Sequence, residues 1–81
     1  MSNLTVAYIL AKVEAGKDQA VLRDVKTLPG VTQATPTYGV YDLHVEVVFE
    51  TMEELDKFIF EGIRMISGIK ETVTLTALRV K

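Results

Sequence analysis

The sequence is poor in the residues that often carry metal, redox or covalent chemistry. It has no cysteine, no tryptophan and one histidine among 81 residues. Without cysteine, neither a disulfide framework nor a thiolate-based metal or redox site is possible. No apolar run approaches the roughly 18–20 residues needed to span a bilayer, and the first residues lack the basic segment and long apolar core of a signal peptide. We therefore expect a cytoplasmic domain without membrane contact.

Positive charge is also scarce. Nine lysines and arginines are scattered along the chain against eleven aspartates and glutamates, which gives a formal net charge of −2. DNA- and RNA-binding modules usually carry a basic stripe, because phosphate contacts supply most of their affinity. No such stripe is present, so we expect no direct binding to nucleic acid.

The length fits one small domain, residues 1–81. Hydrophobic residues at 48% and charged residues at 25% are ordinary for a globular chain. A chain of this size buries roughly 60–65% of its unfolded surface, which leaves its stability marginal. Association with other chains would therefore help to stabilise it.

The first half of the chain reads as strand, helix, strand. Residues 6–13 are apolar at both alternating parities, which is typical of a strand buried on both faces. The helical pattern that follows ends at the Pro-Gly pair after residue 28. Residues 31–38 form a weaker strand that contains Pro36, and because proline cannot donate to a ladder, this strand is predicted at a sheet edge.

The second half repeats the unit. Residues 43–49 alternate apolar and polar side chains, as a half-buried strand does. Thr51 and Glu54 form a predicted capping box that opens a helix, and Arg64 falls on the charged face of that helix. A last strand is predicted over residues 71–78, where threonines alternate with apolar residues.

The order βαββαβ predicts a ferredoxin-like α+β fold. Right-handed crossovers give a four-stranded antiparallel sheet in the order 4-1-3-2, with both helices on one face. The other face is then open, although the first strand is apolar on both sides. A second copy of the chain is the simplest cover, so we predict a sheet-to-sheet homodimer.

Several segments together resemble a known family. They are the first strand with the Glu-Ala-Gly that follows it, the Leu-Pro-Gly-Val turn, the Gly-Val-Tyr-Asp connection at residues 39–42, the Glu-Glu-Leu helix start and the Ser-Gly-Ile turn. This combination is similar to the RAM domain, the ligand-sensing C-terminal half of Lrp/AsnC-type transcription regulators. The likeness runs from about residue 6 to residue 78. No helix-turn-helix precedes the first strand, so the chain resembles stand-alone RAM proteins.

The resemblance implies a non-enzymatic, amino-acid-binding regulatory module. Dimers would associate into higher oligomers, and a free amino acid or similar small metabolite would bind between dimers against the G-x-[YF]-D loop and the last strand. Co-assembly with full-length Lrp/AsnC-type regulators is a further implied partnership. Carried over residue by residue, the ligand-binding positions are Gly39, Tyr41 and Asp42, with Thr72 and Thr74 on the last strand.

The residues themselves leave alternatives open at these positions. Aspartate after a glycine in a hairpin commonly bonds its own backbone, so sequence alone favours turn chemistry and ligand contact about equally for Asp42. Tyr41 can simply pack at the sheet rim. Thr72 and Thr74 can be no more than good strand formers.

His44 has no partner that would make it a metal or catalytic residue. Metal ligands come in sets, and the chain offers no cysteine and no second histidine, so we expect no metal site and no cofactor. A structural place at the dimer seam is favoured. Two alternative functions remain: a small dimeric α/β-barrel enzyme of the monooxygenase kind using His44, and an ACT-like regulatory domain.

Overall fold

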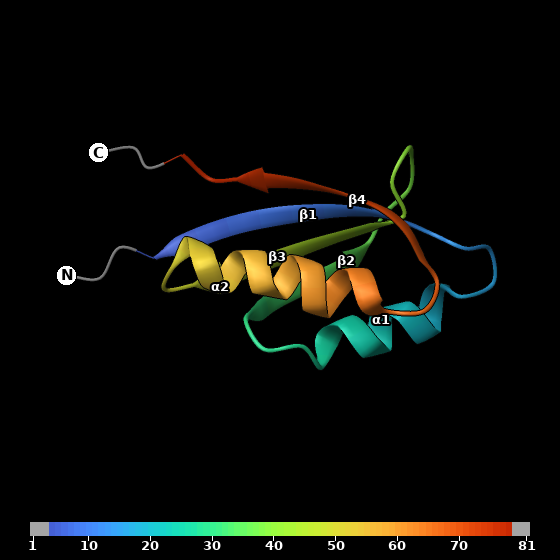
Figure 1. The fold of residues 1–81 in the computed structure, drawn as a ribbon. Helices are drawn as coiled ribbons and strands as arrows, with labels where there is room; N and C mark the ends of the chain where they lie inside the picture. Colours follow the sequence, from blue (N-terminus) through green and yellow to red (C-terminus); the bar gives the residue numbers. More distant parts are fainter. Residues whose placement is uncertain (1–3, 79–81) are drawn as a thin grey trace.

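A four-stranded antiparallel sheet carries helices on one of its faces (Figure 1). The computed structural model describes residues 4–78. The elements in chain order are β1 (Thr5–Val13), α1 (Asp18–Lys26), β2 (Val31–Pro36), β3 (Leu43–Phe49), α2 (Met52–Lys57), a π-helical turn η1 (Phe58–Gly62), a 3-10 turn η2 (Ile63–Met65) and β4 (Ile69–Thr76). The strand order β2-β3-β1-β4 confirms the predicted ferredoxin-like topology.

Strand β1 is the centre of the sheet and pairs with β3 on one side and β4 on the other. The pairing with β4 joins residues that are far apart in the sequence, since Ala7 lies opposite Thr76. Strand β2 pairs only with β3, so Pro36 lies on an edge strand as predicted. The predicted start of the last strand at residue 71 is wrong, because pairing with Val13 already begins at Ile69, directly after the turn at Gly68.

The core lies between the sheet and the helices. Alternate residues of β1 and β3 point into it and meet one stripe from each helix. The fully buried members with the largest side chains are Ile9, Val21, Val25, Val45, Val47, Leu55 and Ile63. The helices account for the burial of one face of the sheet only.

The opposite face of the sheet combines apolar and polar side chains, and no element within residues 4–78 covers it. It carries Tyr8 and Leu10 from β1 and Val73 and Leu75 from β4, and register places these residues side by side. We call this surface the open sheet face. Leu75, on the edge strand β4, is 52% exposed, and a group of exposed apolar side chains on one sheet face is typical of an interaction surface, so the homodimer stays a prediction.

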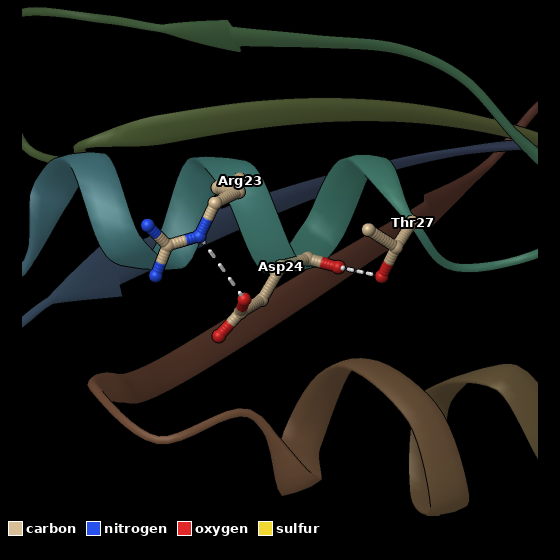
Figure 2. Close-up of polar contacts among 3 residues, drawn as sticks. All are labelled: Arg23, Asp24 and Thr27. Atoms are coloured by element: carbon tan, nitrogen blue, oxygen red, sulfur yellow. Dashed lines mark hydrogen bonds and ion pairs between the residues drawn. The ribbon is translucent and has the colours of Figure 1, made fainter.

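The C-terminal end of helix α1 is capped by hydrogen bonds from Thr27 (Figure 2). The Thr27 hydroxyl donates to the Asp24 carbonyl at 2.7 Å, and the Thr27 backbone N–H donates to the same oxygen at 3.2 Å. These bonds satisfy a carbonyl that has no partner further along the helix. Arg23 lies beside Asp24 with its Nε 3.7 Å from Oδ1, an exposed pair that adds little stability.

The second helix begins as predicted and then departs from regular geometry. The Thr51 hydroxyl accepts from the Glu54 N–H at 3.1 Å, and the Glu54 carboxylate accepts from the Thr51 N–H, which confirms the capping box. After Lys57 the helix widens into the π turn η1 and tightens into η2. A π turn holds an extra residue, so side chains beyond it lie on different faces from those a regular helix would give them.

Two glycines in turns differ in what surrounds them, and this difference allows a matched test. Gly30 (φ +91°) and Gly16 (φ +85°) both have left-handed backbones, but an added Cβ at Gly30 would overlap the Phe49 ring whereas Gly16 faces open space. We expect Gly16→Ala to lower the free energy of unfolding by about 1–2 kcal/mol from backbone strain alone. Gly30→Ala should cost about 1–3 kcal/mol more because the core must shift.

Urea unfolding followed by circular dichroism measures both variants. Equal losses for Gly16→Ala and Gly30→Ala would contradict the packing of Phe49 against Gly30.

Candidate functional site

The connection between β2 and β3 is a loop with a fixed base and a free tip. At the base, the Thr37 N–H donates to the Asp42 carbonyl at 3.0 Å and the Thr37 hydroxyl donates to the Tyr41 carbonyl at 2.8 Å. At the tip, Gly39 has φ +110° and no atom near the position of a Cβ. The loop stands out at the end of the sheet, on the side away from the helices (Figure 1).

Asp42 connects this loop to the central strand. Its backbone N–H donates to the Ala11 carbonyl at 2.8 Å, and its carboxylate Oδ2 accepts from the Val13 N–H at 2.8 Å. The side chain therefore takes the place of a strand carbonyl and extends the β1–β3 ladder beyond Leu43. The turn-local bond, one of the two alternatives that sequence alone left open for Asp42, is not formed by Oδ2, which accepts from a residue 29 positions away. Within residues 4–78, Oδ1 has no hydrogen-bond partner.

Asp42 lies at the edge of a concave surface, which we call the acidic hollow. It has a volume of about 280 Å³ and lies between the loop, the end of β1 and helix α1. Its lining consists of Val13, Asp18, Leu22, Pro36, Thr37, Tyr38, Asp42 and Leu43. Two carboxylates thus face apolar walls, and the lining contains no cationic side chain.

Gly39 and Tyr41 do not line the acidic hollow. Tyr41 is half-buried, and the Lys12 Nζ lies 5.7 Å from its ring centroid. A cation at this distance from an aromatic face is weakly attracted to it. Of the three predicted loop residues, Asp42 is therefore the one that lines the acidic hollow.

Thr72 and Thr74 line a second concave surface, which we call the basic hollow. In the β1–β4 register they lie opposite Ala11 and Ile9, so their side chains point toward the helix layer. The hollow has a volume of about 530 Å³ and is lined by Ile59, Arg64, Ile69, Lys70, Glu71, Thr72 and Thr74. The predicted ligand-binding residues are thus divided between two hollows and a loop tip.

The cationic residues of the basic hollow were missed by sequence reasoning. Arg64 was assigned to the charged face of a regular helix, but it follows the π turn and borders β4. Asp18 and Leu22 of the acidic hollow were also missed. They belong to α1, and a pattern of apolar residues along a helix does not tell which loop packs near its first turn.

His44 is a surface residue of the open sheet face. Its ring stacks on Tyr8 with centroids 5.8 Å apart and an interplanar angle of 20°. It lines neither the acidic hollow nor the basic hollow. Among residues 4–78, no group of three or more histidines, aspartates or glutamates is placed to hold a metal ion. Over the same span, no helix is long and apolar enough to cross a membrane.

The comparisons with known proteins agree on one family. Residues 6–81 match the family model described as Lrp/AsnC ligand binding domain. The HTH-type transcriptional regulator FL11 of Pyrococcus furiosus is 33% identical over 75 residues, which cover 93% of this chain and 49% of that protein. An uncharacterized HTH-type regulator of Pyrococcus horikoshii, PH0140, is 32% identical over 94% of this chain and 48% of its own length.

Solved structures give the same fold. FFRP-DM1 superimposes with a TM-score of 0.88 at 39% identity and covers 91% of this chain and 99% of its own. AsnC of Escherichia coli superimposes with a TM-score of 0.88 at 25% identity, over 94% of this chain and 52% of its own. This chain spans about half the length of the curated relatives it matches.

The bond between Asp42 and Val13 predicts a difference between two substitutions. Asp42→Ala leaves the part-buried Val13 N–H without an acceptor, which should lower the free energy of unfolding by about 1–3 kcal/mol. Asp42→Asn keeps an acceptor oxygen at the same place and should cost less than about half as much. Thermal and urea unfolding of both variants measure the difference, and an Asn variant as unstable as the Ala variant would contradict the assigned bond.

Proposed function

The chain belongs to the Lrp/AsnC ligand-binding domain family, and we propose that it is a non-enzymatic, amino-acid-binding module that works in an oligomeric regulatory assembly. The relatives of known type are transcription regulators of about twice the matched length. The proposed location is therefore the cytoplasm, where such regulators act. Co-assembly with full-length regulators through the shared domain is part of the proposal.

The observation that supports the proposal most directly is the hydrogen bonding of the Asp42 carboxylate. Oδ2 is held by the Val13 N–H, so the group has a fixed orientation, while Oδ1 at the edge of the acidic hollow remains available. The ammonium group of a free amino acid needs an anionic or carbonyl acceptor of this kind. Asp18 adds a second negative charge to a hollow whose lining contains no cation to compete.

The size of the acidic hollow fits a small ligand. Its volume of about 280 Å³ is close to the lower end of the range of about 300–1,000 Å³ that is common for ligand sites. Apolar walls from Val13, Leu22 and Leu43 offer contacts for an aliphatic side chain. The hollow opens beside the loop, where a neighbouring chain can complete it.

The open sheet face supports the oligomeric part of the proposal. Tyr8, Leu10, Val73 and Leu75 form an apolar strip that the helices do not reach. Burying it against a second sheet removes apolar area from water at about 25 cal/mol per Å². A two-fold dimer uses the same surface on both chains, and further association would place the loop of one dimer near β4 of another.

A ligand screen tests amino-acid binding. We expect native mass spectrometry with the twenty amino acids to show binding to the wild type. Asp42→Asn should weaken that binding about tenfold or more, because a charge-assisted bond is lost while the fold is kept. Asp56→Asn, an exposed aspartate on α2, is the matched control and should bind as the wild type does. Absence of binding by all twenty amino acids would refute the proposed ligand class.

A charge on the open sheet face tests the dimer. Leu10→Asp should convert the dimer to a monomer, because an unpaired carboxylate in an apolar interface costs several kcal/mol, on the order of 3–5. The control is Met65→Asp, since Met65 is 73% exposed at the end of the second helix. Light scattering after size exclusion reports both masses. A Leu10→Asp variant that keeps the wild-type mass, or a wild type that is already monomeric, would contradict the sheet-to-sheet dimer.

A further inference from the structure

The basic hollow exists because the sheet edge is not fully covered by the helix layer. Strand β4 points Thr72 and Thr74 toward the helices at positions opposite the buried Ala11 and Ile9. These threonines are only half-buried, because η1 and η2 cover the edge strand incompletely. The resulting space of about 530 Å³ has polar side chains where a core would have apolar ones.

Two irregularities in the backbone border this hollow, and each is associated with one cation. In β4, Lys12 pairs with Glu71 and Val13 pairs with Ile69, so Lys70 is an extra residue without a partner on β1. Such a bulge changes the direction of the side chain it carries. In the second helix, the π turn η1 directly precedes Arg64, and π turns likewise rearrange the side chains that follow them.

Neither cation forms an ion pair with another residue of the described chain. Within residues 4–78 the one ion pair is Arg23 with Asp24, on helix α1. Glu71 also borders the hollow, but in register it lies opposite Lys12, on the strand position that faces the other side of the sheet. The lining therefore holds two cationic groups and one anionic group.

Aromatic contact orients Arg64 without using its donors. The guanidinium carbon lies 5.2 Å from the centroid of the Phe60 ring, which is a cation–π distance. Phe60 itself is 60% exposed and lies outside the lining of the hollow, so it contacts Arg64 from the solvent side. The N–H groups of the guanidinium remain available for a bidentate contact.

Hydroxyl donors complete the set. In the part of the chain that the structure describes, the hydroxyls of Thr72 and Thr74 have no hydrogen-bond partner, although other threonines such as Thr27, Thr32 and Thr37 do. Guanidinium, ammonium and hydroxyl donors around one concave surface are the chemistry that binds a carboxylate.

We propose that the basic hollow is an oxyanion site through which the module selects ligands with a side-chain carboxylate, that is, acidic amino acids over their amides. This inference rests on the proposed binding of amino acids and adds the ligand class. Arg64 and Lys70 are the specificity-determining residues, and Thr72 and Thr74 donate further bonds. The acidic hollow, with Asp18 and Asp42, disfavours carboxylates and is the place for the ammonium end.

Isosteric probes test the selection. Calorimetry at low ionic strength with L-glutamate and L-glutamine compares a carboxylate with an amide of the same shape. Succinate adds a dicarboxylate that has no ammonium group. We expect glutamate to bind about tenfold or more tightly than glutamine, because one or two charge-assisted bonds are lost with the amide.

A matched pair of double variants assigns the effect to the hollow. Arg64→Gln with Lys70→Gln should abolish both the preference for glutamate and the binding of succinate. Arg23→Gln with Lys26→Gln removes the same charges from α1 and should leave both unchanged. All four residues are exposed, so the variants are expected to fold, and circular dichroism checks this.

The outcomes separate the two proposals. Glutamine binding as tightly as glutamate would overturn the oxyanion site while leaving amino-acid binding intact. Succinate binding that depends on Arg64 and Lys70, without binding of any of the twenty amino acids, would support the oxyanion site and refute the proposed function. Binding of no anion, or equal loss in the α1 control, would overturn the inference.

Discussion

The bond from the Asp42 carboxylate to the Val13 N–H is the contact on which the geometry of the loop end depends. It joins the loop before β3 to the last residue of β1, immediately beside the point where the β1–β4 register shifts. A carboxylate that serves as a strand acceptor has a fixed position and keeps its second oxygen free. The structural role and the proposed binding role would therefore fall on one side chain, and they can be separated because an asparagine keeps an acceptor for the Val13 N–H and loses the charge.

Charge of opposite sign is collected in two places on this small chain. The acidic hollow has two carboxylates and no cation, and the basic hollow has two cations and one carboxylate. If the proposed binding of amino acids holds, a zwitterionic or acidic ligand would match such a pair when two chains bring unlike hollows together. The net charge of −2 gives no sign of this separation, since the two groups nearly cancel when they are summed along the sequence.

The fold could be predicted from the sequence because the patterns that indicate strands and helices are local and periodic. Apolar side chains at both parities of residues 6–13 identified the central strand, Pro36 identified an edge strand, and the Thr51 capping box identified a helix start. The family assignment drawn from short motifs is confirmed over residues 6–81. The predicted alternation of the last strand is also confirmed, with threonines on one face and apolar residues on the other. The alternation alone does not tell which of these two faces of the strand points toward the helices.

The arrangement of the hollows could not be predicted for physical reasons. The partner of Asp42 is 29 residues distant, and no local pattern encodes a bond of that range. The π turn before Arg64 breaks the constant rotation that every helical wheel assumes. The bulge at Lys70 follows directly after the turn that begins at Ile66. The position at which the chain leaves this turn and pairs with β1 depends on tertiary contacts.

The pairing of β1 with β4 also determines the order in which this chain can be completed. Ala7 meets Thr76, and the Ala77 N–H donates to the Val6 carbonyl at 2.8 Å, so one side of this central strand is closed by residues that lie far along the chain. Contacts of such long separation carry a large loop-closure cost and slow folding. Until β4 is in place, one edge of β1 presents unpaired backbone N–H and C=O groups, and such an edge is one on which a strand of another chain can pair.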